Sequence, residues 1–136
     1  MIQIKQLFML NTILIVLFSF TAGQAQNDSL MHKVVRYYKS GAPRVEYCYH
    51  PISQDMVKEI CFFPDGSLDY TGEYKKGIEH GSWIFYWENG VIRAQEFYVN
   101  GLENGVMYDY NDQGTPIIEY TYKMGTLIEE KALPTP

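Results

Sequence analysis

Short runs in which apolar and polar residues alternate fill the chain from about residue 34 onward, and glycine-containing turns separate them. In the clearest example, residues 82–87 are followed by Asn89-Gly90 and then by residues 91–98. Two aromatic and β-branched runs around a short glycine connection indicate a β-hairpin, because Gly adopts the positive φ of a tight reversal. We predict a type I turn closed by a left-handed glycine. Equivalent three-residue connections end in Gly41, Gly66 and Gly114.

These hairpins recur with a period of 24 residues. The recurring positions are Gly77, Gly81, Tyr86, Gly90 and Tyr98, followed by Gly101, Gly105, Tyr110, Gly114 and Tyr122. Two looser copies precede them, so four copies occupy residues 34–125. Such repeats determine architecture, and no long segment has a helical apolar period. The predicted fold class is all-β, an antiparallel meander of about eight short strands in a single twisted or curled sheet.

Strand periodicity assigns the side chains to two faces, because successive side chains of a strand point in opposite directions. One parity is apolar or aromatic in every copy, as at Ile84 and Tyr86 in the first strand and at Ala94 and Tyr98 in the second. We expect this parity to form a tyrosine-rich core. The other parity mixes charged and apolar residues, and we expect it to be largely solvated.

The expected solvated face also carries aromatic side chains. They are Trp83, Phe85, Trp87 and Phe97, with Arg93 among them. Large exposed apolar patches are rare in soluble monomers, and Trp and Arg are enriched in binding hot spots. These five residues are therefore a candidate binding surface. The alternative is that a curled sheet or one of the termini covers them.

The beginning of the chain has the plan of a secretory signal peptide. Lys5 precedes the apolar residues 7–20, and a small-residue stretch then ends at Ala25. The apolar run is shorter than the roughly 20 residues that span a bilayer as a helix. We predict cleavage after Ala25 and export to the periplasm or the exterior, with an uncleaved signal anchor as the alternative. The expected organisation is a signal peptide (1–25), an N-terminal linker (26–33), the repeat domain (34–125) and a C-terminal tail (126–136).

Charge narrows the classes of partner. Without residues 1–25 the chain has ten Lys and Arg residues against sixteen Asp and Glu residues, a formal net charge of −6. Binding to nucleic acid or to an anionic membrane depends on clustered Lys and Arg. We therefore expect neither nucleic acid nor an anionic membrane surface as a partner.

The chain has two cysteines, Cys48 and Cys61, and export would place them in an oxidising compartment. Both belong to the expected solvated face of successive strands. A register that pairs Tyr49 with Ile60 would place the two cysteines directly opposite each other, at a spacing that a disulfide bridges. We expect a structural disulfide between them, with two unpaired thiols as the alternative.

Catalytic and metal-binding patterns are absent from the sequence. The three histidines, His32, His50 and His80, show no spacing to one another or to the cysteines that is typical of a zinc site. No nucleophile has a placed base, and no pair of carboxylates is set in a predicted cleft. We expect a protein that is not an enzyme and that uses no metal or cofactor.

The best copy resembles the bacterial variant of the MORN repeat. The matching positions are Gly77, Gly81, Trp83, Tyr86, Asn89, Gly90, Tyr98 and Gly101. The next copy keeps the glycines and tyrosines but has Met107 in place of the tryptophan. The resemblance implies a scaffold of β-hairpins used for binding or assembly, and some bacterial members are labelled antitoxins or immunity-type proteins.

Together these observations predict a non-catalytic, exported interaction or scaffold protein that binds another protein, as an antitoxin or immunity-type protein does. One alternative is a carbohydrate or cell-wall binding module, in which Trp83 and Trp87 would stack on sugar rings. The other is a structural envelope protein that assembles into homo-oligomers through its sheet edges.

Overall fold

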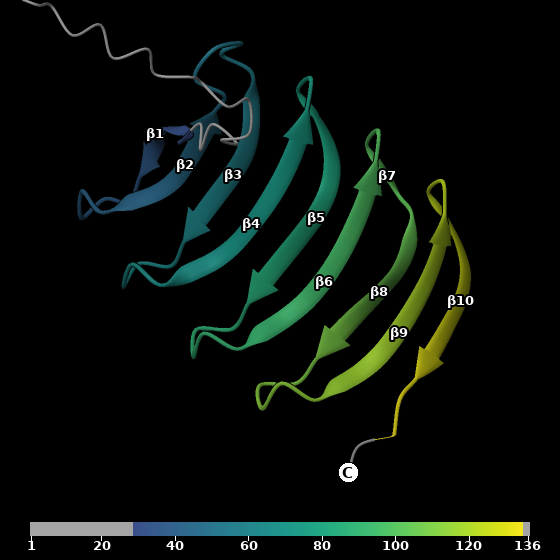
Figure 1. Ribbon diagram of the computed structural model, residues 1–136. Helices are drawn as coiled ribbons and strands as arrows, with labels where there is room; N and C mark the ends of the chain where they lie inside the picture. The colour runs from purple at the N-terminus through teal and green to yellow at the C-terminus, as the bar shows by residue number, and fades with distance from the viewer. Residues whose placement is uncertain (1–28, 135–136) are drawn as a thin grey trace, which may run out of the picture.

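The computed structural model describes residues 29–134, which form one open antiparallel sheet of ten strands. The strands are β1 (Met31–Tyr37), β2 (Pro43–Tyr49), β3 (Met56–Phe62), β4 (Leu68–Lys75), β5 (Ile78–Tyr86), β6 (Ile92–Val99), β7 (Leu102–Glu103), β8 (Gly105–Tyr110), β9 (Pro116–Lys123) and β10 (Thr126–Ala132). They follow one another in chain order, with β1 and β10 at the two edges and the short β7 paired to β6 (Figure 1). These residues contain no helix. The predicted all-β meander is confirmed, with ten strands instead of about eight; the expected signal peptide lies outside the described residues.

The sheet extends further toward both ends of the chain than the sequence indicated. β1 begins inside the expected linker, and β10 lies inside the expected C-terminal tail. The cause at the C-terminal end is a two-residue turn, Met124-Gly125, in which both residues have positive φ. This is the conformation of a type I′ hairpin. The same turn occurs one and two periods earlier, at Asn100-Gly101 and Lys76-Gly77, so the repeat continues for one more strand.

The three-residue turns predicted from the glycines lie at the other end of the strands from the two-residue turns. At the best copy, the Trp87 N–H donates to the carbonyl of Val91, and the Gly90 N–H donates to the carbonyl of Trp87, both at 2.8 Å. Gly90 has a φ of 81°. Its counterparts Gly41, Gly66 and Gly114 also have positive φ, which confirms the left-handed glycine at the end of each turn.

Beside each of these turns the sheet contains a β-bulge. Phe85 pairs with Ala94 but Tyr86 pairs with Ile92, so Arg93 is an extra residue without a partner in the ladder. The extra residues of the other three hairpins are Arg44, Asp69 and Ile117. One inserted residue shifts the register and exchanges the faces of all side chains beyond it.

The bulge overturns half of the expected face assignment. Without it Ile84 would lie opposite Ala94, whereas Ile84 pairs with Gln95, and Trp83 lies between Gly72 and Glu96. One face, here called the tryptophan face, carries Glu59, Cys61, Tyr70, Gly72, Trp83, Phe85, Ala94 and Glu96. The other, the isoleucine face, carries Ile60, Thr71, Ile84, Gln95 and Tyr108. The tyrosines of the second strands therefore share a face with Trp83, and not with Ile84 as expected.

Trp83 is the centre of the largest aromatic cluster. Only 7% of its surface is exposed. Its ring stacks on Tyr70 at a centroid distance of 5.8 Å and meets Tyr74 and Tyr98 edge-on at 5.5 and 5.9 Å. The hydroxyls of Tyr70 and Tyr74 donate to the buried carboxylate of Glu59, at 2.6 and 3.2 Å. Each aromatic pair contributes about 0.5–1.5 kcal/mol beyond its burial.

Gly72 makes room for this cluster, and its replacement tests the packing. A Cβ at Gly72 would lie 2.6 Å from Cε3 of Trp83. We predict that Gly72→Ala lowers the free energy of unfolding by about 1–3 kcal/mol, because overpacking forces side chains out of their rotamers. Denaturant unfolding measures the change. In a Trp83→Phe background the smaller ring should reduce the loss; an equal loss in both backgrounds would contradict the proposed collision.

Candidate functional site

The five residues of the predicted aromatic surface do not form one surface. Trp83 is in the core of the cluster described above. Phe97 pairs with Ser82 on the isoleucine face and is 40% exposed. Phe85, Trp87 and Arg93 lie together beside the three-residue turn, on the tryptophan face. The structure thus divides the predicted surface into a buried member, an isolated member and a contiguous group of three.

Arg93 holds this group together. Its guanidinium carbon lies 5.5 Å from the ring centroid of Phe85 and 5.7 Å from that of Trp87. These are cation–π contacts, and they restrict a side chain that is otherwise flexible. Arg93 reaches both rings because it is the extra residue of the bulge. Trp87 is 37% exposed, and its indole N–H donates to the carbonyl of Tyr110 at 3.3 Å, so its ring is fixed as well.

A surface hollow of about 440 Å³ opens beside Trp87 and Arg93. We call it the Trp87 hollow. Its lining residues are Phe63, Asp69, Tyr86, Trp87, Glu88 and Arg93. Ligand-binding pockets generally combine an apolar lining with a few placed polar groups. The Trp87 hollow, with its aromatic walls and its acidic and basic groups, therefore fits a ligand side chain that is apolar along its length and polar at its end.

The same arrangement occurs at another hairpin. The residue that precedes each three-residue turn is Tyr38, Phe63, Trp87 or Asn111. The guanidinium carbon of Arg44, the bulge residue of its hairpin, lies 5.5 Å from the Tyr38 ring. The Tyr38 hydroxyl donates to the carbonyl of Phe62 at 2.8 Å, as Trp87 does to Tyr110. Sequence reasoning missed Tyr38, Phe63 and Asp69, although the repeat, with a slip of one residue in its first copy, places them at turn positions equivalent to those of Trp87 and Arg93.

The predicted pairing of the cysteines is wrong. Cys48 lies opposite Lys58, and Cys61 lies opposite Val45. The two thiols are free, buried and on opposite faces of the sheet. The physical reason is the short connection between β2 and β3, which spans only residues 50–55 and makes Tyr49 pair with Met56. Burial raises the pKa of both thiols; Glu46 raises that of Cys48 further, and Lys58 lowers it.

The histidines have different surroundings. Nδ1 of His50 accepts hydrogen bonds from the backbone N–H groups of Ile52 and Ser53, both at 3.3 Å, within a turn. Nδ1 of His80 accepts from the N–H of Asn100 at 3.4 Å, and the side chain of Asn104 accepts an equivalent bond in the next repeat. His32 differs from both, because it lies beside Glu46 and Cys48. Within residues 29–134, the side chains of His32, Glu46 and Cys48 form the cluster that could hold a metal ion.

A second hollow, of about 230 Å³, is acidic. Glu96, Glu103 and Asp109 line it together with Met107 and Tyr120. Burial is the main reason why the pKa of Glu96 lies above its ordinary value of 4.5, and the negative charges of Glu103 and Asp109 raise it further. The hydroxyl of Tyr98, 2.9 Å from Glu96, acts in the opposite direction. Like charges held together in this way favour a cationic ligand.

The fold thus defines a class of protein, an all-β repeat protein in which the three-residue turns that end at Gly66, Gly90 and Gly114 and the two-residue turns that end at Gly77, Gly101 and Gly125 each recur every 24 residues. Residues 79–100 match the family model of the MORN repeat variant, which confirms the resemblance. The matched segment covers most of β5, the three-residue turn and β6. No curated protein matches the chain. Within residues 29–134, nothing folds into a helix of the length and apolarity that crosses a membrane.

The raised pKa of Glu96 predicts how its replacement responds to pH. A carboxyl whose pKa is higher in the folded than in the unfolded chain destabilises the fold when ionised, and protonation removes this penalty. Relative to wild type, Glu96→Gln should therefore gain stability as the pH rises through the pKa of Glu96, above 4.5. Urea unfolding from pH 4 to pH 7 measures the difference. Glu129→Gln on the exposed β10 controls for the lost charge; a pH-independent difference at Glu96 would contradict the prediction.

Proposed function

We propose that this chain is an exported, non-catalytic interaction protein that binds a protein partner through the Trp87 hollow, in the manner of an antitoxin or immunity-type protein. The observation that carries the proposal is a partly exposed tryptophan beside an arginine that two aromatic rings already hold in place. Trp and Arg are enriched among the residues that dominate binding energy. The signal-peptide pattern of residues 1–25 supports the export part of the proposal.

Preorganisation favours this hollow over the other exposed apolar residues of the sheet. Ordering a flexible side chain on binding costs roughly 0.5–1.5 kcal/mol. Arg93 is restricted by its two cation–π contacts, and Trp87 by its hydrogen bond to Tyr110. Most of the free-energy cost of ordering these two side chains is therefore met when the chain folds, before a partner binds. A partner that inserts an apolar side chain contacts rings that are already in position.

The two alternative functions have less support from the same features. Sugar binding would have used Trp83 and Trp87 as stacking platforms, but Trp83 is buried and Gly72 lies against its ring. Assembly through sheet edges requires an edge strand that accepts another strand. The edge strand β10 carries Glu129, Glu130 and Lys131, and charges of this kind oppose edge-to-edge pairing.

Trp87 and Phe97 provide a matched pair of substitutions, because the two side chains have similar exposure but lie on opposite faces. The full chain, Trp87→Ala and Phe97→Ala are used as baits for extracts of the source cell envelope, and bound proteins are compared by quantitative mass spectrometry. We predict a protein that wild type and Phe97→Ala retain but Trp87→Ala does not. For that partner, Trp87→Ala should cost about 2 kcal/mol of binding free energy, as a hot-spot residue does.

Circular dichroism of the three baits verifies that each is folded. Equal recovery on Trp87→Ala and wild type would contradict the proposed surface. Retention of cell-wall glycan that depends on Trp87 would support the carbohydrate-binding alternative instead. Self-association that rises with bait concentration in sedimentation experiments would support the structural one.

A further inference from the structure

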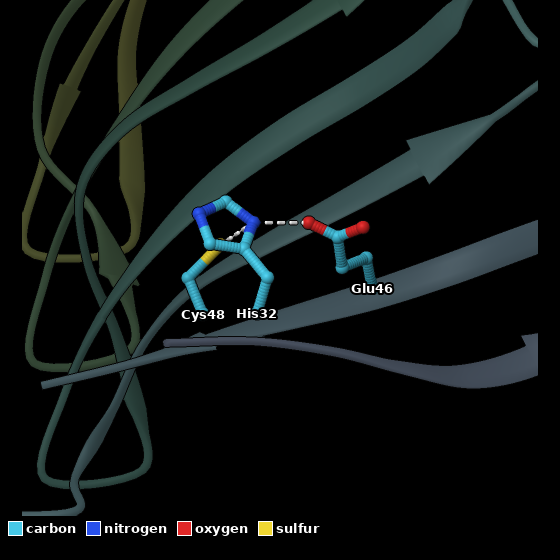
Figure 2. Close-up of polar contacts among 3 residues, drawn as sticks. All are labelled: His32, Glu46 and Cys48. Carbon is cyan, nitrogen blue, oxygen red and sulfur yellow. Dashed lines mark hydrogen bonds and ion pairs between the residues drawn. The ribbon is translucent and has the colours of Figure 1, made fainter. Parts of the chain in front are cut away.

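Three side chains of metal-binding types meet at the β1–β2 end of the sheet, namely His32 of β1 and Glu46 and Cys48 of β2 (Figure 2). His32 is the cross-strand partner of Cys48, and Glu46 lies two residues before Cys48 on the same face. Nδ1 of His32 is 3.7 Å from Sγ of Cys48 and is hydrogen-bonded to Oε1 of Glu46. All three ligand atoms lie within 4.8 Å of one another.

We propose that His32, Glu46 and Cys48 form a binding site for one zinc ion. Tetrahedral zinc, with Zn–S near 2.3 Å and Zn–N near 2.0–2.1 Å, holds the sulfur and nitrogen about 3.6 Å apart. The separation of 3.7 Å between Sγ of Cys48 and Nδ1 of His32 is close to this value. A thiolate, an imidazole and a carboxylate suit zinc, whereas magnesium and calcium prefer sets of oxygen ligands.

The surroundings of the group fit a bound cation with one open position. Cys48 is 1% exposed, so the sulfur is shielded from solvent, whereas 55% of the His32 side chain is exposed and leaves a path for the ion. The thiolate of Cys48 and the carboxylate of Glu46 together neutralise the two positive charges of the ion. Binding releases the thiol proton of Cys48 to solvent, because the thiolate is the metal ligand. A water molecule completes the tetrahedron.

Metal binding at this site would also stabilise the pairing of the edge strand β1 with β2. β2 is the one strand of the described sheet to which β1 is hydrogen-bonded. A zinc ion bound by His32 on one strand and by Cys48 on the other bridges the two strands. Because the ligands come together only in the folded chain, the binding free energy adds to the stability of this pairing.

Cys61 supplies a matched control within the same chain. It is a second free, buried cysteine, but it lies on the tryptophan face between Val45 and Tyr70. Replacement of Cys61 thus removes a thiol of similar burial without touching the proposed ligands. The site is separate from the Trp87 hollow, so the two proposals stand or fall independently.

The test is a titration of the full chain with cobalt(II), after reduction and removal of metal by a chelator. We expect one equivalent of cobalt to produce a thiolate-to-cobalt charge-transfer band and the visible bands of a tetrahedral complex, and zinc to displace the cobalt. Cys48→Ser should abolish the charge-transfer band. His32→Ala should weaken zinc binding at least as much as the roughly 10–100-fold lost with an outer-shell partner. Cys61→Ser should leave both signals unchanged.

His32→Ala and Glu46→Gln keep the test decisive if Cys48→Ser fails to fold, because both replace side chains that are not fully buried. Circular dichroism reports folding for each variant. The proposal is overturned if wild type shows no charge-transfer band. It is also overturned if the band disappears in Cys61→Ser but survives in Cys48→Ser, or if it survives in both His32→Ala and Glu46→Gln at wild-type affinity.

Discussion

A single extra residue beside each three-residue turn determines which side chains of this sheet lie together. Strand side chains alternate with a period of two, so one inserted residue exchanges the two faces of everything beyond it. The insertion occurs at Arg44, Asp69, Arg93 and Ile117, and each hairpin is therefore changed in the same way. The contact of Trp83 with Tyr98 and the position of Arg93 over Phe85 and Trp87 both follow from it.

The sheet has no second layer of helices or strands within residues 29–134, so its stability depends on contacts along the sheet itself. Trp83 is covered by neighbouring rings on its own face, with Gly72 beneath it. Successive repeats are also joined at their turns. The N–H of Gly101 donates to the carbonyl of Glu79 at 2.8 Å, and Gly125 donates to Glu103 at the same distance. Stability that accumulates between neighbouring repeats is typical of repeat proteins.

The sequence was sufficient to predict the elements whose determinants are local. Gly90 and its equivalents fix the turns through their own backbone preference, and the 24-residue period gives the order of the strands. The faces of the sheet were predicted only in part. The alternation of apolar and polar residues does not show where an extra residue is inserted, as Arg93 is between Ile92 and Ala94. The cysteine register failed for a related reason, since it depends on how tightly residues 50–55 close.

The two candidate sites differ in how far they follow the repeat, and this bears on what each is for. The turn position of Trp87 is aromatic in three of the four hairpins. The Trp87 hollow is therefore built at a position where the repeat commonly places an aromatic residue.

Glu46 and Cys48 have no such counterparts. The equivalent pairs in the later hairpins are Thr71 and Glu73, Gln95 and Phe97, and Glu119 and Thr121. The hairpin folds with all of these residues, which means that its architecture does not require a thiol at the position of Cys48. A buried cysteine beside a histidine and a glutamate is therefore a departure from the repeat that packing alone does not explain.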